Sequence, residues 1–167
     1  SCILHSVSDH RKSVPETSAR AYLCDHGGLA LKEAVCKWLS ENGYEVVNYG
    51  TDSAASCDYP DFGVKAAEAV ASGACDFGIV VCTTGIGISI AANKVRGVRC
   101  ALCSEPLSAK MTRLHNNANV LAMGGGMIGV NMGLEIVRTF LETPFSEEGK
   151  HIRRIDKIGE IEKKYMK

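Results

Sequence analysis

A short apolar run in the middle of the chain, Ile79-Val80-Val81, constrains the fold more than any other feature. Continuous β-branched residues of this length are typical of a strand that is buried on both faces of a parallel sheet. From Ile86 onward the hydrophobic pattern is helical. Between these two patterns the segment Cys82-Thr83-Thr84-Gly85-Ile86-Gly87 must turn the chain tightly, which its glycines permit. The sequence therefore predicts a strand, a glycine-rich turn and a helix.

The same alternation of strand and helix runs along the rest of the chain. Besides the central unit, hydrophobic periodicity predicts strands at 20–24, 44–49, 98–103 and 119–123, and helices at 29–41, 60–72, 106–117 and 127–141. This order implies right-handed crossovers between parallel strands. We expect a three-layer α/β/α Rossmann-like fold with a parallel sheet of about five strands.

The two ends of the chain have different patterns. Residues 1–18 are polar and unperiodic, so we expect a flexible N-terminal extension over residues 1–19 and a single domain over residues 20–167. Near the C-terminus isoleucines recur every third residue between lysines and arginines, at Ile152, Ile155, Ile158 and Ile161. This pattern predicts a basic amphipathic helix whose isoleucines dock on their own subunit or on a partner subunit.

Composition excludes several classes of function. Nineteen basic residues balance nineteen acidic ones, so no overall charge favours nucleic acid or an anionic membrane surface. The sequence has neither a run long enough to span a membrane nor the apolar core of a signal peptide, so we expect a cytoplasmic protein. Eight cysteines lack the spacing of a disulfide scaffold, and we expect them to be reduced. Cys100 and Cys103 should point to opposite faces of a strand, which argues against a metal site or a redox pair.

The central turn has the chemistry of an anion site. Its amide groups and the start of the following helix favour a phosphate or a developing oxyanion. A thiol at a helix N-terminus, here Cys82, loses its proton more readily and can act as a base or nucleophile. A buried structural cysteine in a glycine-rich turn explains the same residues equally well. Because Gly85 and Gly87 lack the third glycine of the dinucleotide fingerprint, we do not expect a nucleotide cofactor.

Three polar clusters follow predicted elements of the sheet. They are Asp25-His26-Gly27-Gly28, the turn that begins at Cys82, and His115-Asn116. Ligands of open parallel sheets bind outside the carboxyl ends of the strands, and we expect the three clusters to converge there. A single histidine or aspartate at a helix end is more often a cap or a solvated side chain, so the functional interpretation depends on this convergence.

Four motifs in order carry a family resemblance: Asp25-His26-Gly27-Gly28, Asp58-Tyr59-Pro60-Asp61, the Cys82 turn leading into Ala91-Ala92-Asn93-Lys94, and His115-Asn116. Together they resemble the B-type ribose-5-phosphate isomerases, a family that also acts on galactose 6-phosphate and allose 6-phosphate. The similarity covers about residues 20–158. It implies interconversion of an aldose phosphate and its ketose through a cis-enediolate, most simply ribose 5-phosphate and ribulose 5-phosphate of the pentose phosphate pathway. It also implies no cofactor or metal, and a homodimer or tetramer with shared active sites.

The resemblance assigns a role to each candidate residue. It implies that Cys82 is the base that moves the proton, that Thr84 orients or relays protons, and that His115 assists ring opening. Substrate hydroxyls would be contacted by Asp25, a catalytic candidate, and by His26. The remaining candidates would bind substrate: Tyr59, Thr83, Gly85, Ile86, Gly87, Asn116, Lys150 and Arg154. Among them, the amides of the turn would hold the enediolate oxygen. Lys150 and Arg154 would reach the phosphate from the partner subunit.

The chain departs from the family pattern around the phosphate. Thr83 stands where the family usually has glycine, and Gly126 stands where many members have an arginine. Lys150 replaces the first of two C-terminal arginines, and Arg113 and Arg153 are candidate substitutes. Three alternatives therefore stay open. The first is an isomerase whose substrate is allose 6-phosphate, galactose 6-phosphate or a tetrose phosphate. The second is a non-catalytic subunit of such an enzyme, and the third, based on cysteine content alone, is a thiol-based redox protein.

Overall fold

A parallel sheet forms the centre of the molecule. The computed structural model describes residues 19–23, 28–48 and 58–166, and in these ranges the sheet has four strands in the order β1-β2-β4-β3. Their bounds are β1 (Ala19–Leu23), β2 (Phe77–Cys82), β3 (Cys100–Leu102) and β4 (Val120–Gly124). All three pairings are parallel, and Cys82 at the end of β2 lies opposite Gly124 at the end of β4. The predicted parallel α/β arrangement is confirmed.

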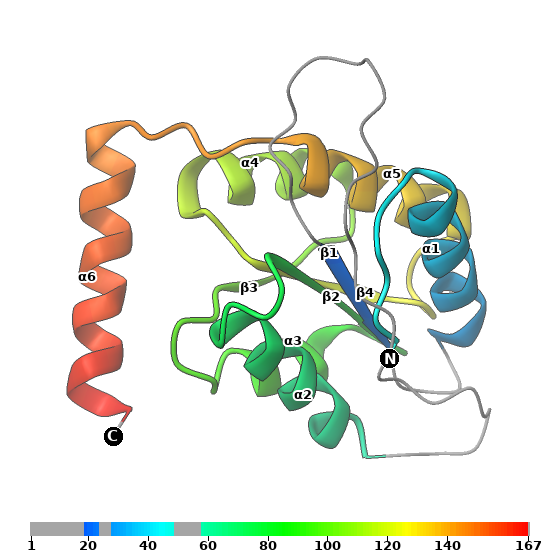
Figure 1. The fold of residues 1–167 in the computed structure, drawn as a ribbon, viewed down its shortest axis with the longest axis horizontal. Helices are drawn as coiled ribbons and strands as arrows, with labels where there is room; N and C mark the ends of the chain where they lie inside the picture. Colours follow the sequence, from blue (N-terminus) through cyan, green and yellow to red (C-terminus); the bar gives the residue numbers. More distant parts are fainter. Residues whose placement is uncertain (1–18, 24–27, 49–57, 167) are drawn as a thin grey trace.

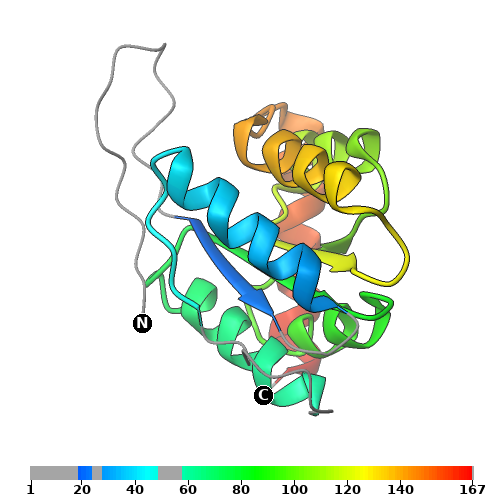
Figure 2. The same cartoon turned by 90° about the vertical axis from the view of Figure 1, so that its right-hand side faces the viewer.

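Helices cover both faces of the sheet, which gives the three layers seen in Figure 2. One face carries α1 (Leu29–Glu41), α4 (Pro106–Asn116) and α5 (Val130–Glu142); the other carries α2 (Tyr59–Ala71) and α3 (Ile86–Ala92). The sixth helix, α6 (Gly149–Tyr165), stands beside these layers in Figure 1. The predicted helices agree with these bounds to within one residue, except that α5 begins three residues later than expected.

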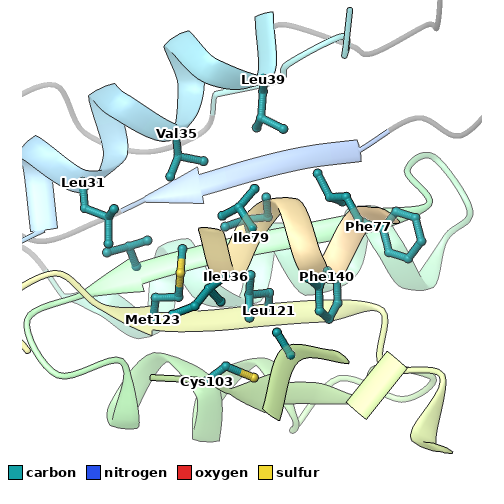
Figure 3. Packing of buried hydrophobic residues seen from close by; sticks show 14 of the residues in the cluster. Leu31, Val35, Leu39, Phe77, Ile79, Cys103, Leu121, Met123, Ile136 and Phe140 are labelled. Carbon is teal, nitrogen blue, oxygen red and sulfur yellow. The ribbon is translucent and has the colours of Figure 1, made fainter. Parts of the chain in front are cut away.

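Two apolar cores lie on the two faces of the sheet, and β2 contributes to both. Ile79 and Val81 pack in the core beneath α1 and α5, part of which Figure 3 shows, whereas Val80 and Cys82 pack in the core beneath α2 and α3. All six residues of β2 are buried. The continuous apolar run is therefore explained by burial on both faces, as predicted.

Two predicted strands differ from the structure. Residues 44–48 form no strand, although Val46 and Val47 are buried. Burial of these two adjacent valines explains their apolar character without hydrogen bonding to a neighbouring strand. The predicted strand at 98–103 is shorter, because only Cys100–Leu102 pairs with β4. Residues 1–18 of the predicted flexible extension lie outside the described residues, and Ala19 is the first residue of β1.

The predicted C-terminal helix is present, and it is held at both ends. The segment before it is bonded to α4, where Ser146 N donates to Leu114 O at 3.2 Å. Near its other end, both carboxylate oxygens of Glu162 accept from Gly97 N at 3.2 Å. In α6 three of the four isoleucines are exposed, Ile155 is half-buried, and the one buried residue is His151. No helix within the described ranges is long and apolar enough to cross a membrane.

Candidate active site

The turn after β2 places a nearly buried thiol at the carboxyl edge of the sheet. Cys82 is 4% exposed, and the amide of Gly85 donates to its Sγ at 3.1 Å. One residue further on, the Ile86 amide donates to Thr84 Oγ1 at 3.2 Å, while the Thr84 side chain is exposed. The turn therefore holds a sulfur as a hydrogen-bond acceptor beside the first turn of α3.

The turn has no room for a side chain at Gly85. Gly85 has φ +76°, and a Cβ built on it would stand 2.6 Å from the Met123 carbonyl carbon. The turn is also bonded to the loop after β4, because Gly125 N donates to Cys82 O at 2.8 Å and Gly126 N donates to Thr83 O at 2.9 Å. The two loops consequently act as one rigid unit at this edge of the sheet.

Tyr59 joins the same edge from the start of α2. A Cβ built on Gly87 would lie 2.5 Å from Tyr59 Cζ and 2.7 Å from its Oη, so the phenol ring covers the backbone at the start of α3. Tyr59 is 39% exposed. The structure therefore brings this residue to the Cys82 turn. Asp25 and His26 lie outside the described residues.

His115 and Asn116 do not join this edge. Asn116 O accepts from Arg99 Nε at 3.0 Å, and Arg99 immediately precedes the first residue of β3. The pair therefore lies at the amino edge of the sheet, where α4 ends and β4 begins (Figure 1). Along β4 the two edges are about 13 Å apart at roughly 3.3 Å per residue. The prediction that His115-Asn116 lies with the other polar clusters at the carboxyl ends of the strands is wrong, because α4 runs back across the sheet and ends at the opposite edge.

The amino edge carries a second group of polar side chains, supplied by α4 and α6. The imidazole rings of His115 and His151 are stacked, with centroids 4.3 Å apart and planes at 12°. Lys150 Nζ pairs with Glu148 at 2.7 Å, and Arg154 is exposed one turn further along α6. Lys150 and Arg154 therefore lie with His115, not with Cys82. Sequence reasoning missed His151, although its i, i+4 spacing to Ile155 places it on the helix's inward stripe.

Arg113 has a structural position that removes it from the phosphate candidates. The side chain is 6% exposed, its guanidinium lies 4.6 Å from the Phe77 ring centroid, and it donates to Ala118 O at 2.7 Å. Burial lowers its pKa to about 10. Arg113 thus fastens the end of α4 to the core. Arg153, the other candidate, is exposed on α6.

The two cysteines of the Cys-x-x-Cys pattern lie on opposite faces of the sheet. Cys100 belongs to the core beneath α2 and α3 and Cys103 to the opposite core, as predicted. Burial raises the pKa of Cys100 to about 12 and that of Cys103 to about 11, so both are protonated near neutral pH. Within the described ranges, no three histidine, cysteine or acidic side chains gather as metal ligands.

An all-parallel sheet between helical layers, with a hydrogen-bonded cysteine where the central strand meets a helix, defines an α/β enzyme of the Rossmann-like class. More particularly, the chain belongs to the Ribose/Galactose Isomerase family, whose sequence model matches residues 21–158. It is an aldose–ketose isomerase.

Several known relatives support this membership. Ribose-5-phosphate isomerase B of Escherichia coli (strain K12) is 44% identical over 86% of this chain and 96% of its own length. Galactose-6-phosphate isomerase subunit LacB of Clostridium acetobutylicum is 39% identical over 84% of this chain and 83% of its own length. Among solved structures, ribose-5-phosphate isomerase B of Clostridium thermocellum is 52% identical with a TM-score of 0.85, covering 88% of this chain and 99% of that one.

Proposed function

We propose that this chain interconverts ribose 5-phosphate and ribulose 5-phosphate, with Cys82 as the base. The observation that carries the proposal is the hydrogen bond from the Gly85 amide to the nearly buried Cys82 sulfur, at the place where an anion is favoured. Relatives named for ribose 5-phosphate support the substrate. One of them, from Mycoplasma genitalium, is described with bound ribulose 5-phosphate and is 38% identical, with a TM-score of 0.82 over 88% of this chain.

The proposed reaction moves one proton between neighbouring carbons. After ring opening, in which His115 exchanges a proton with the ring oxygen, the Cys82 thiolate takes the proton from C2 of the aldose. The electron pair left at C2 forms the cis-enediolate, and the resulting thiol returns the proton to C1 while a proton shifts from the oxygen on C2 to that on C1. Thr84, an exposed residue two positions after Cys82 in the same turn, is the candidate to relay this second proton.

Four turn amides are candidates to hold the enediolate oxygen, and two of them have partners inside the turn. Gly85 N donates to Cys82 Sγ and Ile86 N donates to Thr84 Oγ1. The amides of Thr84 and Gly87 are the remaining candidates. A donor in this role typically contributes about 3 kcal/mol to transition-state stabilisation. Tyr59, packed over Gly87, would close the pocket on this side.

We infer that the complete site forms between two copies of the chain. Cys82 and Tyr59 lie at the carboxyl edge, whereas His115, Asn116 and the basic start of α6 lie at the amino edge of the same chain. Separated by about 13 Å along a strand, the two groups cannot act on one sugar phosphate within one chain. In a two-fold dimer, the amino edge of each copy can meet the carboxyl edge of the other, which gives two complete sites.

Exposed apolar surface supports such a dimer. On α6, Ile152, Ile158 and Ile161 are 43%, 39% and 58% exposed. Between α6 and the edge strand β3 lies a cavity of about 440 Å³ with mainly apolar walls. Surfaces of this kind, on a helix face that the described part of the chain leaves exposed, are typical of a protein interface.

The substrate is tested by assaying the purified protein with ribose 5-phosphate, allose 6-phosphate, galactose 6-phosphate and erythrose 4-phosphate, each repeated with Cys82→Ser. We expect turnover of ribose 5-phosphate that falls by at least about a thousandfold in the variant, because loss of the proton-transferring base leaves only binding and electrostatic effects. Unchanged turnover in a folded Cys82→Ser protein would contradict the mechanism. Activity on another sugar alone would correct the substrate.

Shared sites are tested by mixing two inactive variants, Cys82→Ser and His115→Ala, after unfolding and refolding them together. If the sites are shared, each mixed dimer has one intact site, and random pairing restores about a quarter of wild-type activity. If each site belonged to one chain, no mixture would recover activity. Recovered activity therefore shows that the active sites are shared, whichever surface forms the dimer.

A second candidate is a subunit that needs a different partner chain. Gly126, where many members of the family have an arginine, favours it, and the relative LacB is itself named a subunit. Its distinguishing result is a pure protein that is inactive on all four sugars and becomes active only when a second family member is added.

A further inference from the structure

The stacked histidines join the end of α4 to the start of α6. His115 is exposed on the last turn of α4, and His151 lies in the first turn of α6, with ring centroids 4.3 Å apart. His151 is 4% exposed, whereas Ile152, Ile158 and Ile161 of α6 are exposed. The contact that α6 makes with the end of α4 is therefore anchored by an imidazole and not by an aliphatic side chain.

The chain before α6 fixes where this imidazole lies. Arg113 Nε donates to Thr143 O and Ser146 N donates to Leu114 O, both at 3.2 Å, so the connection from α5 is fastened along α4. At the helix start, His151 N donates to Glu148 O at 2.8 Å. Because its backbone is held by these bonds, the His151 ring has little freedom to move away from His115.

We propose that His151 is a positioning residue for His115: by stacking, it fixes the plane of the imidazole that exchanges a proton during ring opening. The inference rests on the proposed function, in which His115 reaches the substrate of the partner subunit's pocket. An exposed side chain in the last turn of a helix samples several rotamers, and a flat ring packed against one face restricts them. The restriction holds the ring nitrogens of His115 in one direction before substrate arrives.

Charge at the stack supports a division of roles. Burial and the neighbouring His115 lower the pKa of His151 below its ordinary value of 6.5, against the opposing influence of Glu148. The positive charges of Lys150 and Arg154, on the same helix, also lower the pKa of His151. His151 Nε2 is buried without a hydrogen-bond partner among the described residues. His151 therefore stays neutral near pH 7 and leaves proton exchange to the exposed ring.

The kinetic test compares His151→Ala with His151→Phe, because phenylalanine keeps a flat ring without a titrating nitrogen. For the alanine variant we expect kcat on ribose 5-phosphate to fall about tenfold with KM within about twofold of wild type, since only the preorganisation of His115 is lost. The phenylalanine variant should recover kcat to within about threefold of wild type. An unchanged kcat in the alanine variant, or a phenylalanine variant as slow as alanine, would overturn the proposal.

A second readout does not depend on turnover. NMR of the imidazole Cε1–H groups across the range from about pH 4 to about pH 9 should show His151 titrating below 6.5 in the wild-type protein and at higher pH in His115→Ala, which removes a neighbouring charge and part of the burial. If His151 titrated at the same pH in both proteins, the two rings would not be stacked. If the wild-type protein has no isomerase activity, the proposed function fails, while this titration still decides whether the stack exists.

Discussion

The Thr83 side chain occupies the space beside Gly126: a Cβ built on Gly126 would stand 3.1 Å from Thr83 Cγ2 and 3.0 Å from Thr83 O. These are two of the positions at which the chain departs from the pattern of its family, which usually has a glycine at the first and often an arginine at the second. Because Thr83 and Gly126 touch, the side chain gained at position 83 and the side chain lost at position 126 are physically linked.

This contact predicts that Gly126→Arg is tolerated better together with Thr83→Gly. Alone, the arginine crowds Thr83, and we expect a loss of about 1–3 kcal/mol in the free energy of unfolding. With glycine at position 83, the crowding at Cγ2 is removed and about 1 kcal/mol should return as a coupling energy. Urea denaturation of the two single variants and the double variant measures it. Strictly additive effects would show that the two positions are independent.

A second prediction concerns Gly85. Its positive φ and the 2.6 Å approach of an added Cβ to the Met123 carbonyl carbon both oppose a side chain, so Gly85→Ala should lose more than about 3 kcal/mol of stability. Gly43 is the matched control, since it has φ +80° but nothing within 4 Å of such a carbon. Gly43→Ala should lose only about 1–2 kcal/mol, the cost of the backbone conformation. Equal losses in thermal denaturation would argue against steric crowding at the turn.

The proposed dimer gives a third prediction, at the exposed face of α3. Ile86 and Ile90 are four residues apart and 52% and 57% exposed, directly after the Cys82 turn that must meet a second copy. Ile90→Glu should therefore shift the protein toward the monomer in size-exclusion chromatography with light scattering, and activity should fall with it. Leu107→Glu is the control, because Leu107 is 63% exposed on α4, which covers the opposite face of the sheet. A dimer that persists in Ile90→Glu would exclude α3 from the interface.

A fourth prediction follows from the start of α4. The Glu105 carboxylate caps this helix, accepting from the Leu107 amide at 2.6 Å and the Ser108 amide at 2.7 Å. The hydrogen bond from the Ser108 side chain, with these amides, lowers the pKa of Glu105 below its ordinary 4.5. A lowered folded-state pKa means that the stabilisation is complete above about pH 4.5 and is lost as pH falls through the folded value. Glu105→Gln should lower Tm at about pH 7 and flatten its decline toward about pH 3, whereas an unchanged decline would exclude Glu105 as a contributor.

Local patterns were sufficient for most of the architecture. The β-branched run of β2, the proline at the start of α2 and the spacing of apolar residues in α1 each depend on interactions close in sequence or on burial of a single element. The segment at 44–48 shows the limit of such patterns. Its buried valines are compatible with a strand or with extended chain, and only pairing with a neighbouring strand distinguishes them.

By itself, the sequence determined the alternating α/β fold, the tight turn at Cys82 and the basic helix at the C-terminus, because periodicity and glycine placement specify them locally. Tertiary structure alone decided which candidate site residues are neighbours. It placed His115 and α6 at the edge opposite Cys82, stacked His151 on His115 and buried Arg113 beside two aromatic rings. The physical reason is that each crossover helix returns across the sheet, so residues at its two ends reach opposite edges whatever their spacing in the sequence.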